Sequence, residues 1–153
     1  MNFTEEHILL DLSADTQEEL FMLLANYAKE LGVIEDAKKV SEAFMEREQQ
    51  FSTGLQEGFA IPHAKSAYVL TPTVLYVQLK QPVPWETFDD SPVQHVFALL
   101  VPVEEAGTLH LEMLSRLATA LMEETFIEDI QQHQDKAFLV QRISKEMLGE
   151  RIL

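Results

Sequence analysis

Hydrophobic and polar residues recur along this chain in two periods, one typical of strands and the other of helices. Alternation by two, or a short apolar run, predicts four strands, at residues 7–13, 59–62, 73–80 and 93–101. Spacing by three and four predicts five helices, at residues 16–31, 36–50, 108–123, 124–132 and 135–148. The last strand is almost continuously apolar, as in the centre of a sheet. These patterns therefore predict an α/β sandwich. We expect a single domain over residues 1–153, with a mixed parallel and antiparallel β-sheet flanked by helices on both faces.

Composition and charge narrow the function classes. The chain is 46% hydrophobic and 24% charged, as expected of a folded domain, and it contains no cysteine, which excludes disulfides and thiolate chemistry. Its formal net charge of −15 disfavours nucleic acid and anionic membranes as partners. The chain has neither an apolar run long enough to span a bilayer nor a signal-peptide pattern. We expect a cytoplasmic protein without nucleic-acid binding or direct membrane insertion.

Arg47 occupies an unusual position for a charged side chain. In the second predicted helix and just beyond it, Ala37, Val40, Phe44 and Phe51 define one apolar seam, and Arg47 fills the remaining position of that seam. A guanidinium on a core-facing seam is rare unless it is paired or faces a cleft. Two interpretations stay open: the head reaches solvent or a carboxylate while the stem packs, or it is a fixed set of donors for a phosphate or carboxylate.

His110 raises a similar question in the helix predicted at 108–123. It shares a face with Leu114, Leu117 and Leu121, and it lies in the first turn. The positive end of the helix dipole favours a neutral imidazole there, and the exposed amides favour a nearby anion. The position is compatible with a core histidine and with a histidine beside a bound anion.

His63 follows a proline at the end of an apolar run. Pro62 fixes its own φ and favours an extended Ile61, so the backbone leading to the imidazole has little freedom. Gly54 and Gly58 permit a close approach of the backbone or a positive φ. These features suit a nucleophilic imidazole at a strand end. A cis-proline turn with an incidental histidine would need the same proline.

The stretch STGLQEGFAIPHAKS resembles the enzyme IIA domains of the fructose/mannitol type, in the bacterial phosphoenolpyruvate-dependent sugar phosphotransferase system. The family pattern is a Thr-Gly pair followed by a Gly-Ile-Ala-Ile-Pro-His core. The residues that match it are Thr53, Gly54, Gly58, Ala60, Ile61, Pro62 and His63. The flanking segments FMEREQQFSTG and LLVPVEEAGTLHLEMLSRLATAL are also similar to the family, so the resemblance covers nearly the whole chain. It implies the mannitol-type IIA fold.

The resemblance implies roles for the three unusual residues. In this family the histidine matching His63 carries the phosphoryl group. The residues matching Arg47 and His110 lie beside it, as a phosphate clamp and a hydrogen-bond donor. The binding residues implied around them are Thr53, Gly54, Gly58 and Pro62. Gln56 departs from the glycine frequent in the family, which predicts either an ordinary φ at this position or a polar side chain near the phosphate.

The implied function is that of a phosphoryl carrier. It accepts phosphate from phospho-HPr on His63 and passes it to a IIB component during sugar uptake, without a metal, nucleotide or other cofactor. One alternative is a regulatory, nitrogen-type module whose phosphorylation state controls a protein partner. A metal-dependent hydrolase that uses His63 and His110 has no ligand motif to support it.

Overall fold

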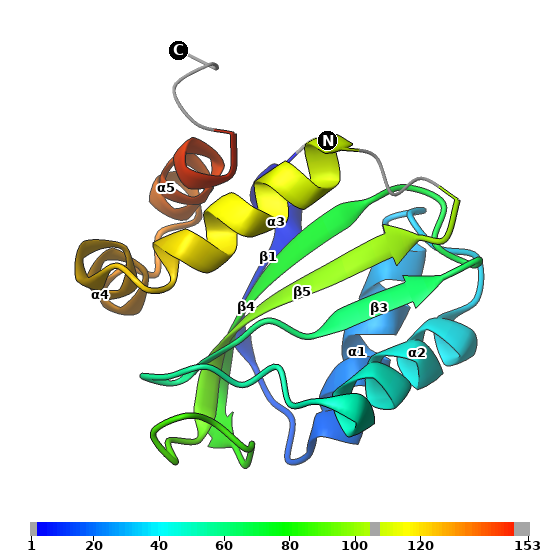
Figure 1. Ribbon diagram of the computed structural model, residues 1–153, viewed down its shortest axis with the longest axis horizontal. Coiled ribbons are helices and arrows are strands. Elements are labelled where there is room, and N and C mark those ends of the chain that lie inside the picture. Colours follow the sequence, from blue (N-terminus) through cyan, green and yellow to red (C-terminus); the bar gives the residue numbers. More distant parts are fainter. Residues whose placement is uncertain (1–2, 105–107, 149–153) are drawn as a thin grey trace. The chain divides into compact units, whose positions relative to one another are not determined.

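The computed structural model describes residues 3–104 and 108–148, without the side chains of residues 108–111. Contacts divide the described residues into two compact units, one of residues 9–104 and the other of residues 3–8 and 108–148. The first unit contains the sheet and two helices, and the second contains three further helices (Figure 1).

A mixed five-stranded sheet forms the centre of the first unit. Its strands are β1 (Ile8–Leu12), β2 (Phe59–Ala60), β3 (His63–Ser66), β4 (Thr73–Val83) and β5 (Val93–Pro102). The strand order is β1-β4-β5-β2, and β3 also pairs with β5. β4 runs antiparallel to β5, whereas β2 and β3 run parallel to it. The predicted mixed α/β sheet is therefore confirmed, and β5 is its central strand.

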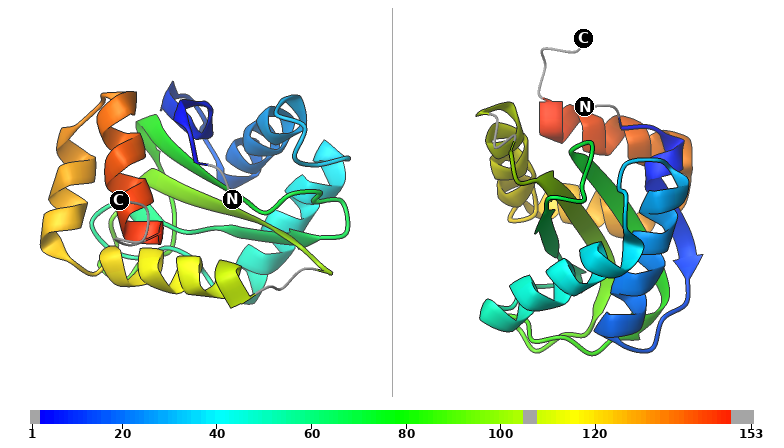
Figure 2. Two further views of the ribbon diagram at one scale, coloured as in Figure 1. Left: turned by 90° about the horizontal axis from the view of Figure 1, so that it is seen from above. Right: turned by 90° about the vertical axis from the view of Figure 1, so that its right-hand side faces the viewer.

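Helices α1 (Gln17–Glu30) and α2 (Ala37–Gln50) lie side by side and cover one face of this sheet (Figures 1 and 2). Their apolar stripes and the facing strand residues form one buried cluster. Its central members are Leu20, Phe21, Leu24, Val40, Phe44, Leu75, Val77, Val96 and Ala98. Burial of these side chains, at roughly 1.5–3 kcal/mol each, is the main force that holds the two helices on the sheet.

The ends of α1 and α2 follow the capping signals in the sequence. The Thr16 hydroxyl accepts from the Glu19 amide at 3.1 Å, and the Asp36 carboxylate accepts from the Lys39 amide at 3.1 Å. Gly32 has φ +78°, the left-handed conformation that ends a helix at low cost for glycine. Both predicted helices are confirmed within a few residues.

The strand predicted at 59–62 ends earlier than expected, at Ala60, as β2. The Ile61 amide donates to the Thr53 carbonyl oxygen at 3.0 Å, and Pro62 has no N–H, so the pairing with β5 is interrupted there. The chain resumes pairing as β3, which the sequence did not predict because its residues HAKS are few and mostly polar. His63 is thus the first residue of a strand and does not follow the end of one.

Phe51 corrects the predicted apolar seam of α2. Its side chain is 77% exposed, whereas Val40 and Phe44 are buried. The spacing was extrapolated beyond the end of the helix, and Phe51 has already left it, with φ −150° and ψ 137°. The seam therefore ends at Arg47.

The second unit consists of helices α3 (Thr108–Ala120), α4 (Glu124–Gln132) and α5 (Lys136–Leu148) with a 3-10 turn at Glu5–His7. α5 contacts α3 and this turn. The buried apolar side chains of α3, α4 and α5 include Met113, Leu117, Phe126, Ile127, Ile130, Leu139, Ile143 and Met147. The three helices lie where the sequence predicted them, within three residues at each end.

Candidate functional site

The backbone on both sides of Pro62 is held in place. His63 opens β3, where it pairs with Leu99 of β5. The Leu99 amide donates to the Pro62 carbonyl oxygen at 2.9 Å, and the Ile61 amide donates to the Thr53 carbonyl oxygen at 3.0 Å. Pro62 is buried, and the peptide bond that precedes it is trans. The His63 imidazole is therefore presented from a connection with little freedom, and the cis-proline turn is not formed.

The half-buried ring of His63 is shifted toward its neutral form. Burial is the largest cause of its lowered pKa, and the positive charge of Arg47 lowers this pKa further. The Ile61 backbone and the Glu48 carboxylate act in the opposite direction. Nδ1 is buried without a hydrogen bond of ordinary geometry. At neutral pH the ring is uncharged, so one nitrogen has a lone pair that can attack an electrophile.

Arg47 lies in the last turn of α2, and α2 packs against β3. Its half-buried side chain donates from Nη1 to the Phe51 carbonyl oxygen at 2.8 Å. Within the described part of the chain, no carboxylate lies at ion-pair distance from it. The sequence left open that a carboxylate pairs with Arg47, and no such partner is found within the described residues. The positive charge of Arg47 instead acts on His63 and lowers its pKa. A guanidinium has five N–H donors, and this arrangement leaves donors for an anion beside the imidazole.

Glu48 connects its own helix α2 with Thr53 and Trp85, near Arg47 and His63. The sequence did not single it out as a functional residue. Its Oε2 accepts from the Thr53 amide at 2.7 Å and from Trp85 Nε1 at 3.1 Å. Its Oε1 accepts from the Thr53 hydroxyl at 2.6 Å. The helix dipole disfavours a carboxylate in the last turn of a helix, so a glutamate there needs specific donors. That mismatch is the signal by which the sequence could have revealed it.

The loop between Thr53 and β2 closes in a tight turn. The Phe59 amide donates to the Gln56 carbonyl oxygen at 3.2 Å. Glu57 and Gly58 have φ +55° and +84°, which correspond to a type I′ turn. The positive φ expected at Gly58 is confirmed. Gln56 has no positive φ, in agreement with the first of its two interpretations, and Glu57 adopts the left-handed conformation instead.

Gly54 is the point where a second loop, residues 84–92, approaches most closely. A Cβ atom on Gly54 would lie 2.2 Å from the Glu86 carbonyl oxygen, so a side chain could be accepted only if the backbone shifted. The Ser52 hydroxyl donates to the same oxygen at 2.6 Å. The close approach predicted for Gly54 is confirmed, and the loop at 84–92 supports the loop that leads to His63.

Asp89 organises the far part of this supporting loop. Its Oδ2 accepts from the Glu57 amide at 2.9 Å, and its Oδ1 accepts from the Ser91 hydroxyl at 2.6 Å. The hydrogen bond from the Ser91 side chain is the largest cause that lowers the pKa of Asp89, to about 2. The Ser91 hydroxyl accepts from the Gly58 amide at 3.2 Å. The turn before β2 is therefore tied to a carboxylate that stays charged well into the acid range.

His110 belongs to α3, in the second unit. The backbone of this helix is described, but the side chain of His110 lies outside the described residues. Its place beside the phosphoryl group therefore stays a prediction from the sequence.

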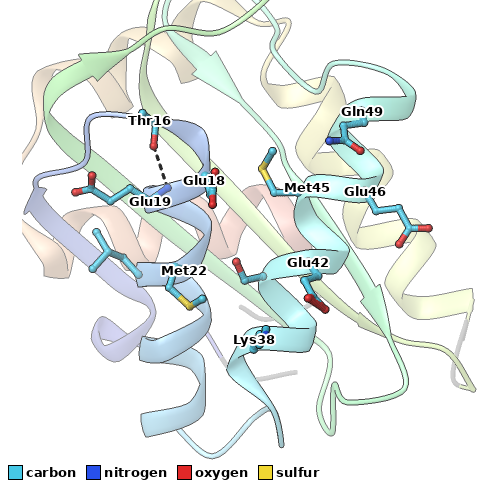
Figure 3. A pocket seen from close by; sticks show the side chains of 11 residues that line it. Thr16, Glu18, Glu19, Met22, Lys38, Glu42, Met45, Glu46 and Gln49 are labelled. Atoms are coloured by element: carbon cyan, nitrogen blue, oxygen red, sulfur yellow. Dashed lines mark hydrogen bonds between the residues drawn. The ribbon is translucent and has the colours of Figure 1, made fainter.

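A groove between α1 and α2 is separate from this site (Figure 3). It has a volume of about 890 Å³, and neither Arg47 nor His63 lines it. The charged side chains that line it are Glu18, Glu19, Lys38, Glu42 and Glu46. This excess of carboxylates repels a phosphoryl group, so the groove is not a second candidate for the same chemistry.

In residues 3–104 and 108–148, no group of three or more His, Asp or Glu side chains could hold a metal ion. None of the helices described there has the length and apolar character to cross a membrane.

A family model and two curated relatives match this chain. The family model "Phosphoenolpyruvate-dependent sugar phosphotransferase system, EIIA 2" matches residues 1–146. The fructose-specific EIIABC component of Bacillus subtilis is 37% identical over 121 residues, which cover 79% of this chain and 19% of the relative. The fructose-specific EIIA component of Haloferax volcanii is 33% identical over 131 residues, 86% of this chain and 84% of the relative. The chain thus spans about a fifth of the first relative and most of the second.

Two solved structures share the fold. The nitrogen regulatory protein IIA-Ntr from Neisseria meningitidis has a TM-score of 0.81 at 31% identity, over 91% of this chain and 94% of that one. A complex of mannitol enzyme IIA with phosphorylated enzyme IIB, from Escherichia coli, matches at a TM-score of 0.73 and 22% identity, over 91% and 94% of the two chains. The mannitol-type IIA fold is confirmed.

The chain therefore belongs to the EIIA type 2 family of the phosphoenolpyruvate-dependent sugar phosphotransferase system. Its role is that of a phosphoryl-carrier IIA component.

Proposed function

We propose that His63 is the residue that carries the phosphoryl group, accepted from phospho-HPr and passed to a IIB component during sugar uptake. The observation that carries this proposal is the neutral, half-buried imidazole at the start of β3, within range of the Arg47 charge. A neutral imidazole is a nucleophile, and a nearby guanidinium favours an incoming anion.

The transfer is an exchange between two imidazoles. A lone pair on the His63 ring attacks phosphorus as the P–N bond of the donor phosphohistidine breaks, and the electrons of that bond stay on the donor ring. The second step repeats this exchange toward the acceptor, and no water is consumed. Because Nδ1 is buried, Nε2 is the nitrogen that we assign to the new bond. The P–N bond of the donor supplies the driving force, so the step requires neither metal nor nucleotide.

Catalysis in such a transfer is mainly positioning and charge stabilisation. Arg47 would clamp the equatorial oxygens, and His110 would donate a hydrogen bond to them. The supporting residues would be Thr53, Gly54, Gly58 and Pro62, which fix the backbone that leads to His63. In this proposal the family domain, residues 1–153, acts as one functional unit.

The partners follow from the same chemistry. The solved complex of a mannitol IIA with a phosphorylated IIB supports a IIB domain as the acceptor. The phosphohistidine of HPr is the donor in our proposal, and we place the reaction in the cytoplasm, where no nucleic acid or membrane insertion is involved. The net charge of −15 would steer a partner with a basic face toward the protein.

The proposal is tested by incubating the chain with phosphoenolpyruvate, enzyme I and HPr. Wild type should gain an acid-labile adduct of ~80 Da, the mass of HPO₃. His63→Gln should gain none, and His95→Asn, which removes a different buried imidazole, should gain it as wild type does. A wild-type chain that stays unmodified, or an adduct that persists in His63→Gln, would reject His63 as the carrier.

The regulatory alternative is favoured by one observation, the similarity to a nitrogen regulatory protein structure at 31% identity. Both roles share the phosphorylated histidine and differ in the receiver. Complementation of strains that lack individual IIA components separates them. A chain that gains phosphate but restores the uptake of no sugar supports the regulatory role.

A further inference from the structure

The Glu48 carboxylate receives more hydrogen bonds than a helix-surface glutamate needs. Three donors from two other segments converge on it, at 2.6, 2.7 and 3.1 Å. Two of them come from Thr53 and one from Trp85. Hydrogen bonds to a charged acceptor are about twice as strong as those between neutral groups, so this cluster fixes the relative positions of α2 and the two loops.

The third donor connects this cluster to the core of the unit. Trp85 is 9% exposed and contacts Phe21 edge-to-face at 5.9 Å. Phe21 in turn stacks on Phe44 at 5.0 Å, and Phe44 is on α2, as Glu48 is. The Trp85 indole is therefore a fixed partner, and the carboxylate that it holds cannot move freely.

A short path joins Arg47 to His63 through this carboxylate. Glu48 follows Arg47 in α2 and accepts from the amide and the hydroxyl of Thr53. The Thr53 carbonyl oxygen accepts from the Ile61 amide, two residues before His63. The two sides of the site are thus connected by hydrogen bonds through one glutamate.

We propose that Glu48 is a positioning residue for phosphoryl transfer, which fixes the Arg47 guanidinium and the His63 imidazole in register around one phosphoryl group. This inference rests on the function proposed above and assigns to Glu48 no contact with the transferred group. A loop that was free of α2 would let the two sides of the site separate. A shift of about 1 Å in such a geometry can cost a hundredfold in rate.

The negative charge of Glu48 and its proposed positioning role act on phosphoryl transfer in opposite directions. The charged groups that act on His63 are Arg47, which lowers its pKa, and Glu48, which raises it. Removing the charge of Glu48 makes the imidazole more readily neutral, which by itself favours transfer. A slower reaction in a neutral variant therefore reports lost positioning rather than a change in protonation.

The test compares Glu48→Gln with Glu46→Gln, which removes one charge from the exposed side of the same helix. The glutamine amide cannot accept at both positions of the carboxylate. Single-turnover transfer from phospho-HPr should slow about tenfold or more in Glu48→Gln, through kcat rather than KM, and stay within about twofold in Glu46→Gln. The acid limb of the pH profile should move to lower pH in Glu48→Gln.

Thr53→Val provides a second test, because it deletes the hydroxyl donor and leaves the charge of Glu48 in place. It should slow transfer without moving the acid limb. Wild-type rates in both variants would overturn the proposal, as would a deficit that disappears once the variant is assayed at a temperature where it is as fully folded as wild type. Exchange of the Ile61 amide should accelerate in Glu48→Gln. An unchanged exchange rate there refutes the path even if the wild type proves to accept no phosphate.

Discussion

Two imidazoles in the first unit have their pKa lowered by burial, yet their surroundings differ. His95 lies on β5, where its Nδ1 is 2.8 Å from the Tyr76 hydroxyl and its ring stacks on Phe59 at 4.7 Å. Burial lowers the pKa of His95 to about 4. His63 has a buried Nδ1 without a hydrogen bond of ordinary geometry, and it lies within range of the Arg47 charge.

The comparison shows that a lowered pKa does not by itself mark a functional histidine. Burial makes both rings neutral at pH 7. Only at His63 does a cation without a carboxylate partner, within the described residues, also favour an anion beside the ring. His95 lies among aromatic neighbours on β5, the central strand of the sheet.

The largest effect is expected at Arg47. Arg47→Ala should slow transfer to His63 a hundredfold or more, about 3 kcal/mol of transition-state stabilisation, because the donors for the equatorial oxygens are lost. His95→Asn should stay within about threefold of wild type, because its ring is committed to Tyr76 and Phe59. Single-turnover rates with phospho-HPr measure both. Equal losses of transfer rate in Arg47→Ala and His95→Asn would contradict the functional distinction between His63 and His95.

The second prediction concerns how the free energy of unfolding depends on pH because His95 is neutral in the folded protein. An unfolded imidazole binds a proton near pH 6.5 and the folded one near pH 4, so stability falls as the pH drops between these values and levels off below them. The loss is at most about 3.5 kcal/mol, at roughly 1.4 kcal/mol per pH unit. His95→Asn should lose less stability between pH 7 and 4.5 in urea unfolding. Among the histidines whose side chains are described, His7 and His63 also have a lowered pKa, and both remain in the two proteins. Parallel pH dependences would therefore contradict the assignment to His95.

The smallest effect is expected at Asp89, which supports the His63 side of the comparison from the surface. Its pKa is lowered to about 2, so the stability that it contributes is present above about pH 3.8 and is lost as the pH falls through 2. Asp89→Asn should unfold at a lower temperature than wild type at pH 5, and the gap should narrow at pH 2. A gap that stays constant between these pH values would show that the charge of Asp89 is not what holds the turn.

Much of the fold could be predicted because its signals are local. Thr16 and Asp36 cap helices through bonds that span three residues, and Gly32 ends one through its own φ. β3 could not be predicted, because its polar residues form a strand only by pairing with β5, more than thirty positions away. Phe51 was misplaced because a helical spacing carries no information about where the helix stops.

The candidate site divides in the same way. Arg47 and His63 were recognised from the sequence because each departs from its local pattern, and the structure brings the His63 ring into range of the Arg47 charge. Glu48 was not recognised, because its partners Thr53 and Trp85 become visible only once two loops meet. His110 stays a prediction.

The parallel pairing of β3 with β5 also determines when in folding the His63 imidazole can be held in its final position. His63 pairs with Leu99, and the Ser52 hydroxyl with the Glu86 carbonyl, so both supports of the site close loops of more than thirty residues. Contacts of such high sequence separation form late, because their entropic cost precedes any gain. During synthesis β5 must leave the ribosome before β3 can pair with it and hold the His63 imidazole in place. A chain that stalls in the loop after β4 would contain the complete Ile-Pro-His motif and still lack the strand that presents it.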